Sequence, residues 1–206
     1  IHLGPEPGFQ PATGRQFLEQ QNISHSYWLS VGTIEPRKNL VRLLEAYRIF
    51  REQSEEQVLL MIVGQRGWKS EAFFEALESH PFRADILLTG FVADSALAEL
   101  YTHSIGLVYP SEYEGFGLPV LEAFACGCPV VCSNVSSLPE VGGEVARYVE
   151  PYNTDSIAQQ MIALYRLSAV ERQGLKEAAL RRAAEFSWER YAANCIEAFR
   201  RLEGGA

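Results

Sequence analysis

The chain of 206 residues is 47% hydrophobic and 21% charged, which suits one α/β domain whose core needs neither disulfides nor metals. Its net charge of −8 argues against nucleic acid or an anionic membrane as a general partner, so an anionic ligand needs local cations and backbone amides. No apolar run reaches the roughly 18 residues of a membrane span. The chain opens on Ile1 rather than Met, and we therefore expect a piece of a longer protein.

The chain divides into an irregular start and a regular remainder. Residues 1–24 carry proline and glycine without periodicity and predict a linker with a short helix. From residue 25, apolar runs alternate with amphipathic stretches. Strands are expected over Tyr27–Gly32, Val58–Val63, Ile86–Thr89, Leu107–Tyr109, Pro129–Cys132 and Arg147–Val149. Helices are expected over Leu40–Glu52, Ser70–Glu78, Ser95–His103, Pro119–Cys126, Ser156–Leu167, Ala169–Glu185 and Trp188–Leu202.

This alternation predicts a Rossmann-like, doubly wound parallel sheet with additional helices at the C-terminus. The run Val58–Val63 is apolar throughout, as a strand covered on both faces should be. In such sheets ligands bind beyond the carboxyl ends of the strands, so the informative residues should lie just after each strand.

The four cysteines are Cys126, Cys128, Cys132 and Cys195. The first three could suggest a metal site. However, residues 128–132 are expected to form a buried strand whose alternate side chains face opposite ways, and no histidine lies nearby. Reduced, buried cysteines in a cytoplasmic protein are the better interpretation.

The first candidate site segment runs from Gly32, after the first strand, to Asn39. It carries Arg37 and Lys38 to the start of the next helix, where free amides and the helix dipole favour an anion. The planar guanidinium of an arginine, which can donate two parallel hydrogen bonds, and the compact ammonium charge of a lysine together suit a diphosphate. The alternative is a solvated basic pair on a loop.

The second segment, from Pro110 to Glu122, leaves the fourth strand and enters a helix. Gly115 and Gly117 flank Phe116 and allow the backbone to approach a ligand closely. Glu114 and Glu122 lie eight residues apart, so they can accept hydrogen bonds from a sugar and from a ribose diol at two ends of one ligand. The alternative is a loop carboxylate and an exposed helix residue.

Four stretches in order resemble glycosyltransferase family 4, the group 1 enzymes. They are EPRKN, TGFV at Thr89–Val92, YPSEYEGFGLPVLEAFACGCPVVCSNVSSLPEVGG at Tyr109–Gly143, and FSW at Phe186–Trp188. The resemblance implies a retaining enzyme of the GT-B fold, in which two Rossmann-like domains face each other. Residues 25–206 would be the C-terminal nucleotide-sugar-binding domain and residues 1–24 the inter-domain linker, with the N-terminal acceptor domain absent from this chain.

The resemblance also implies residue roles. Glu114 and Glu122 match the E-x7-E motif, with Glu114 meeting the donor sugar and Glu122 the ribose. Arg37 and Lys38 would hold the diphosphate, and with Glu114 they form the expected catalytic set. The remaining donor-binding positions are Gly115, Phe116, Gly117 and Leu118 at the distal phosphate and sugar, Gly32 in the first segment, and Val63, Gly64, Phe91 and Val92 near the base.

The implied reaction transfers a sugar from a nucleotide diphosphate to an acceptor hydroxyl with retained configuration. The family usually needs no metal, and no D-x-D motif exists here, because the only aspartates are Asp85, Asp94 and Asp155. We expect no cofactor, no nucleic-acid partner, and an acceptor glycan or lipid bound through the absent domain. The stretch at Glu112–Glu122 is similar to GDP-mannose-using mannosyltransferases of polysaccharide and lipopolysaccharide synthesis, although UDP-sugar users carry nearly the same motif. Such an enzyme would be cytoplasmic, and the resemblance allows peripheral association with the inner face of the membrane.

Other classes of protein share some of these features. A glycoside hydrolase also uses two carboxylates, but it has no use for Arg37 and Lys38. A GT-B nucleotide-sugar epimerase, a sucrose- or phosphate-using relative, and a non-catalytic nucleotide-binding module stay open. Trp68 is expected to pack on its loop, with a contact to the base as the alternative.

The last expected helix carries one apolar stripe at helical spacing. Its members are Trp188, Tyr191, Ala192, Cys195, Ile196, Phe199 and Leu202. In the family this helix packs on the N-terminal domain, so the stripe should be partly exposed in the present chain. The alternative is that the helix folds onto its own domain.

Overall fold

A six-stranded parallel sheet forms the centre of the computed structural model, which describes residues 2–54 and 56–203, with side chains up to residue 201. The strand order is β3-β2-β1-β4-β5-β6. The strands are β1 (Tyr27–Val31), β2 (Leu59–Val63), β3 (Ile86–Gly90), β4 (Gly106–Tyr109), β5 (Val130–Ser133) and β6 (Arg147–Val149). The predicted Rossmann-like sheet is confirmed, and each strand lies within one residue of its expected position or matches it.

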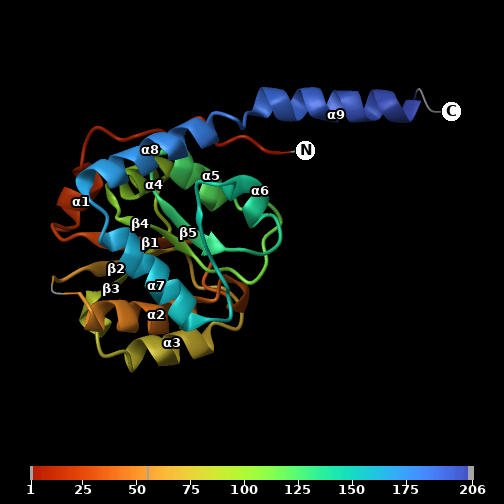
Figure 1. The fold of residues 1–206 in the computed structure, drawn as a ribbon. Coiled ribbons are helices and arrows are strands. Elements are labelled where there is room, and N and C mark those ends of the chain that lie inside the picture. Colours follow the sequence, from red (N-terminus) through yellow and green to blue (C-terminus); the bar gives the residue numbers. More distant parts are fainter. Residues whose placement is uncertain (1, 55, 204–206) are drawn as a thin grey trace.

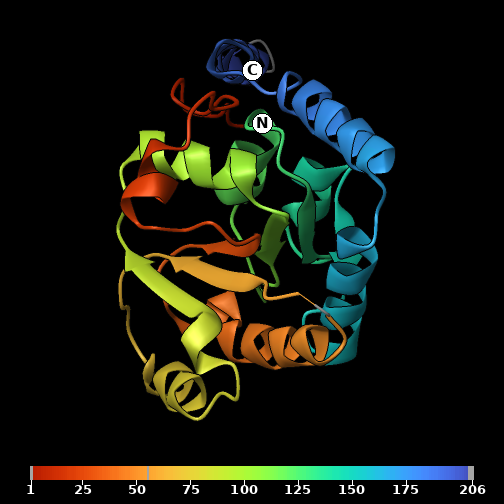
Figure 2. The ribbon, with the colours of Figure 1, turned by 90° about the vertical axis from the view of Figure 1, so that its left-hand side faces the viewer.

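Helices cover both faces of this sheet (Figures 1 and 2). One face packs against α2 (Leu40–Glu52), α3 (Glu71–Glu78) and α7 (Thr154–Tyr165). The other packs against α1 (Gln16–Gln20), α4 (Asp94–His103), α5 (Leu118–Ala125) and α8 (Ala169–Ala183). The short helix α6 (Leu138–Gly142) follows β5 and was not predicted, and a 3-10 turn, η2 (Arg83–Asp85), precedes β3.

Alternation along the strands divides the core into these two layers. In β1, the fully buried Trp28 lies in the α2–α3–α7 layer, whereas Tyr27 and Leu29 lie in the other. Every residue of β2 is buried, which explains its continuous apolar sequence. Cys126, Cys128 and Cys132 are buried in the second layer, as expected for small hydrophobic side chains.

The segment before β1 packs on the domain. Phe9 and Leu18 are buried, and the carboxylate of Glu99 on α4 accepts the backbone N–H groups of Phe17 and Leu18 at 3.1 and 2.8 Å. The short helix expected within residues 1–24 is present as α1.

The serines that precede two of the helices behave differently. Ser168 and Glu171 form a capping box at the start of α8. Ser70 does not cap α3, because its hydroxyl donates to the carbonyl of Gly67 at 3.1 Å.

The last helix, α9 (Trp188–Glu203), extends away from the sheet (Figure 1). Trp188, Ile196 and Phe199 are 38%, 52% and 67% exposed. The expected exposure of the stripe is therefore confirmed for these side chains, while the Leu202 side chain lies outside the described residues. No helix in the described part of the chain is both long and apolar enough to cross a membrane.

Candidate functional site

The loops that follow four neighbouring strands surround a cleft of about 500 Å³ at the carboxyl edge of the sheet. These loops follow β1, β2, β3 and β4, as the fold predicts. The cleft wall brings together seven of the predicted site residues: Gly32, Val63, Gly64, Phe91, Val92, Leu118 and Glu122.

The floor of the cleft is a close approach of two glycines. Gly32 and Gly64 have φ values of +133° and +152°, and a Cβ on Gly64 would lie 2.0 Å from the carbonyl oxygen of Gly32. A Cβ on Gly32 would in turn meet Cε of Lys38 at 2.9 Å. Only glycine fits this crossing. Lys38 therefore runs beside the floor and connects the cleft to the charged cluster described next.

The two predicted cations lie in a 3-10 turn, η1 (Pro36–Lys38), directly before α2. They precede the helix and do not occupy its first turn, since Asn39 takes a left-handed conformation with φ of 58° between the two elements. The Asn39 side chain donates to the carbonyls of Pro110 and Pro151 at 2.9 and 2.6 Å. This ties the turn to the loop after β4.

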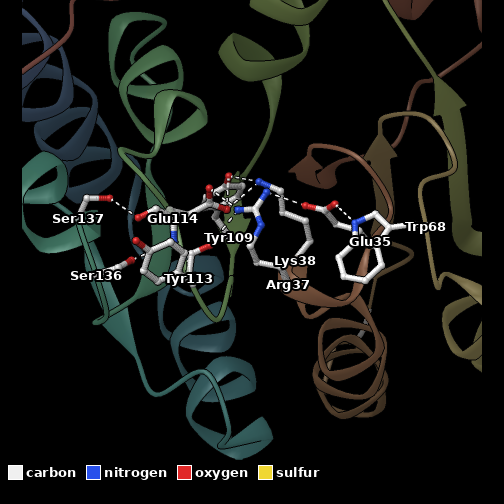
Figure 3. A network of polar contacts seen from close by, with 9 residues as sticks. All are labelled: Glu35, Arg37, Lys38, Trp68, Tyr109, Tyr113, Glu114, Ser136 and Ser137. Carbon is white, nitrogen blue, oxygen red and sulfur yellow. Dashed lines mark hydrogen bonds and ion pairs between the residues drawn. The ribbon is translucent and has the colours of Figure 1, made fainter.

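Arg37, Lys38 and Glu114 form one ion-paired cluster (Figure 3). Lys38 Nζ lies 2.7 Å from Glu114 Oε1, and Arg37 Nη1 lies 2.7 Å from Glu114 Oε2. The hydroxyl of Tyr109 accepts from Lys38 at 2.5 Å and donates to Glu114 Oε1 at 2.7 Å. The prediction assigned separate ligand contacts to the cations and the carboxylate, whereas in the fold they are direct partners.

The charges in this cluster depend on one another. Burial acts to raise the pKa of Glu114, but hydrogen bonds from Lys38 and Tyr109 outweigh it and hold this pKa below its ordinary value. Burial lowers the pKa of Lys38, and the pairing with Glu114 offsets only part of that effect. Burial and the neighbouring carboxylate raise the pKa of Tyr109, so its hydroxyl remains a donor.

The backbone of Glu114 is held by the loop after β5. The hydroxyl of Ser136 accepts the N–H of Glu114 at 3.0 Å, and the hydroxyl of Ser137 donates to its carbonyl at 2.9 Å. Sequence reasoning missed both serines, although they lie within the stretch that resembles the family. Their hydroxyls fix the direction in which the Glu114 side chain leaves the loop.

Glu122 lies on α5 in a different environment. Its Oε2 accepts a hydrogen bond of 3.0 Å from the buried hydroxyl of Tyr101. Burial raises the pKa of Glu122, and the negative charges of Asp94 and Glu6 add to the increase. No cation of the described residues is paired with this carboxylate.

Phe116 packs away from the two glutamates. Its ring lies 6.2 Å from that of Phe186, and 6.1 Å from that of His2, between ring centres. Gly117, with φ of 98°, precedes the first residue of α5. The loop therefore offers a ligand its backbone, since the aromatic ring is engaged elsewhere.

Sequence reasoning also missed Glu35, which joins Arg37 to Trp68 (Figure 3). The prediction that Trp68 packs on its own loop is wrong, because this side chain is 60% exposed and its indole N–H donates to Glu35 at 2.7 Å. The described residues contain no group of three or more His, Cys, Asp or Glu side chains that could hold a metal ion.

The sequence matches a known family over most of its length. Residues 17–182 match the family model described as Glycosyl transferases group 1. The chain belongs to this family. It is 39% identical over 197 residues to the O-antigen chain mannosyltransferase B of Escherichia coli, covering 93% of this chain and 50% of the relative. It is 34% identical to a serotype-specific mannosyltransferase WbdA of Escherichia coli, covering 89% of this chain and 23% of that protein. This group 1 chain thus spans half or less of these relatives.

Solved structures agree with the fold. The sucrose-phosphate synthase of Thermosynechococcus elongatus superposes with a TM-score of 0.84 at 23% identity, covering 100% of this chain and 52% of that one. The C-terminal domain of the group 1 glycosyl transferase LpcC from Francisella tularensis superposes with a TM-score of 0.73 at 25% identity. That match covers 88% of this chain and 96% of the solved domain.

Proposed function

We propose that this chain is the donor-binding part of a retaining glycosyltransferase, which moves a sugar from a nucleoside diphosphate to an acceptor hydroxyl. One observation carries the proposal: the cleft with its glycine floor is joined through Lys38 to the Arg37–Lys38–Glu114 cluster. A backbone-lined cleft suits a nucleoside, and the adjoining cations suit its phosphates.

In this proposal the ligand lies along the carboxyl edge of the sheet. The base lies against the Val63–Gly64 and Phe91–Val92 segments, and Glu122 accepts hydrogen bonds from the ribose hydroxyls. The diphosphate lies beside Gly32, where Arg37, Lys38 and the backbone of residues 115–118 can reach it. Glu114 then accepts hydrogen bonds from the donor sugar, as an ionised carboxylate can.

The catalytic contribution would be electrostatic. As the bond between the anomeric carbon and the phosphate oxygen breaks, the leaving diphosphate gains negative charge, and the acceptor oxygen bonds to the carbon while its proton passes to the departing phosphate oxygen. Arg37 and Lys38 would stabilise that developing charge from fixed positions. Because both cations are paired with Glu114 in the present structure, they must share their N–H groups with the phosphates when the donor binds.

The proposed identities of the sugar and the acceptor rest on the names of the relatives and on the family resemblance. The matched Escherichia coli proteins are named as mannosyltransferases, one of them of the O-antigen chain. We propose a GDP-mannose-type donor, no metal or other cofactor, and a growing polysaccharide or lipopolysaccharide as acceptor. The acceptor would bind through an N-terminal domain that covers the apolar stripe of α9, on the cytoplasmic side of the membrane and in peripheral contact with it.

The test is a titration of the full-length protein by calorimetry in the presence of a chelator. GDP, UDP, ADP and their sugars are compared, and we expect a nucleoside diphosphate to bind without added metal. A parallel assay follows release of nucleoside diphosphate from the bound sugar nucleotide, with and without a mannose-terminated oligosaccharide. Absence of binding by all three diphosphates at millimolar concentration would refute the assignment. Sugar isomerisation without transfer would instead identify an epimerase.

A further inference from the structure

Glu35 lies between two hydrogen-bond donors. Its Oε1 accepts from Arg37 Nη2 at 2.6 Å, and its Oε2 accepts from the indole Nε1 of Trp68 at 2.7 Å (Figure 3). The side chain is only 13% exposed, so water competes weakly for these oxygens. Each carboxylate oxygen therefore has a fixed donor, and a side chain with a single acceptor oxygen could not serve both.

The opposite edge of the Arg37 guanidinium is held as well. Nη1 lies 2.7 Å from Glu114 Oε2 and donates to the carbonyl of Tyr113 at 2.9 Å. A guanidinium is planar, so contacts to both terminal nitrogens fix the direction of its N–H groups. Glu35 is the contact on the Nη2 side, opposite Glu114.

The loop that carries Trp68 is joined to the loop that carries Glu35. Ile34 N–H donates to Gln65 O at 2.9 Å, and Gly67 N–H donates to Ile34 O at 3.0 Å. A Cβ on Gly67 would lie 2.5 Å from Cγ2 of Thr33, which shows how closely the two loops approach. The exposed Trp68 ring is thus brought to Glu35 by backbone pairing rather than by burial in the core.

We propose that Glu35, fixed by the indole N–H of Trp68, is a positioning residue that orients Arg37 toward the diphosphate. This inference rests on the proposed function, which assigns the diphosphate to Arg37. The competing view is that Glu35 is only a negative charge near the phosphates. The two views predict opposite signs: removing a nearby negative charge strengthens anion binding, whereas removing a positioning contact weakens it.

The experiment measures GDP affinity of the full-length protein and its Glu35→Gln variant by calorimetry. The amide turns an NH₂ group toward either Arg37 or Trp68, so one of the two contacts is lost. We expect the dissociation constant to rise about tenfold, the effect of one hydrogen bond to a charged group. The matched control is Glu112→Gln, which makes the same charge change two residues from Glu114 but pairs with Arg42. This variant should bind GDP as tightly as the unmodified protein or more tightly, because it removes a negative charge without removing a side-chain contact to Arg37.

A second variant separates positioning from a general structural effect. Trp68→Phe removes the indole N–H, so in the double variant the amide oxygen of Glu35→Gln is free to face Arg37. We expect the double variant to recover much of the affinity that Glu35→Gln loses, a coupling that independent damage would not produce. Unchanged or tighter binding by Glu35→Gln, or no recovery in the double variant, would overturn the inference. Failure of the unmodified protein to bind GDP, UDP or ADP would instead refute the proposed function.

Discussion

The two ends of the candidate site hold their glutamates in opposite ways. Glu114 lies against two cations, and despite its burial the hydrogen bonds from Lys38 and Tyr109 hold its pKa below the ordinary value, whereas burial raises the pKa of Glu122. Each accepts a hydrogen bond from a buried tyrosine, Tyr109 at 2.7 Å and Tyr101 at 3.0 Å. The tyrosines are alike, so the cations make the difference. Two carboxylates of one motif can therefore have different tasks because the fold gives only one of them counter-charges.

The largest effect is expected from removing the counter-charges. Arg37→Ala combined with Lys38→Ala should weaken binding of a nucleoside diphosphate by at least ~100-fold, because hydrogen bonds to charged groups contribute roughly 1.5–3 kcal/mol each. Calorimetry on the full-length protein measures the change. Arg48→Ala is the control, since Arg48 pairs with Glu45 and Glu52 on α2, outside the cluster. Equal affinity in the double variant and the unmodified protein would refute the phosphate assignment.

Replacing Glu122 and replacing Glu114 should have different effects on nucleotide affinity and on kcat. Glu122→Ala should weaken bare nucleotide and nucleotide sugar alike, because both contain the ribose. Glu114→Ala should leave bare diphosphate binding intact while strongly lowering kcat, since the loss of one contact to Arg37 is offset by the removal of a negative charge beside both cations. Measuring kcat by kinetics and nucleotide affinity by calorimetry, on the same preparations, tests both expectations. An equal loss of bare-nucleotide affinity in both variants would contradict these roles.

The charges of Glu114 and Glu122 should change the free energy of unfolding with opposite signs. The lowered pKa of Glu114 stabilises the folded chain above the pKa of the unfolded state, so Glu114→Gln should be less stable than the unmodified protein at pH 7. The raised pKa of Glu122 has the reverse effect, and Glu122→Gln should be more stable at pH 7.

The Glu114 difference should shrink as the pH falls from about 4, the pKa of an unfolded carboxyl group, through the lower folded pKa, whereas the Glu122 difference should already shrink above about pH 4, as the pH falls through its raised folded pKa. Urea unfolding at pH 7 and under acid conditions measures them. A change of the same sign in both variants at pH 7 would show that the two environments are not opposite.

The smallest effect is expected at the tyrosines. Tyr101→Phe and Tyr109→Phe each remove one donor, so both should raise the pKa of the partner carboxyl group. The shift should be larger for Glu122, because Arg37 and Lys38 still contact Glu114 after the change. Titration of the glutamate side chains by NMR compares the two shifts. A larger shift at Glu114 would mean that Tyr109, rather than the cations, sets its ionisation.

Most of the fold could be predicted because it depends on local patterns. The apolar run of β2 is visible in the sequence, and so is the spacing of Ser168 and Glu171 that forms the capping box. The helix α6 could not be predicted in the same way. It spans only Leu138–Gly142 and contains both a proline and a glycine, so no helical period can be recognised.

The site was predictable in its residues but not in its contacts. Glycines and charged side chains after strand ends indicated the carboxyl edge, and the cleft lies there. The pairing of Lys38 with Glu114 joins residues 76 positions apart, and no spacing rule gives such a contact. Glu35 and its hydrogen bond with Trp68 were missed for the same reason, since this contact depends on how two loops meet.

The crossing of Gly32 and Gly64 has a consequence for how such a protein can be altered. This part of the cleft is main chain, and any side chain added at Gly64 would collide with the Gly32 carbonyl. Substitution therefore cannot reshape the floor without moving both loops. New ligand preferences would have to be introduced at the rim, where Phe91 is 74% and Leu118 36% exposed. A mutant library directed at those two positions samples the variable part of the cleft, while one directed at the glycines mainly yields chains whose loops cannot close.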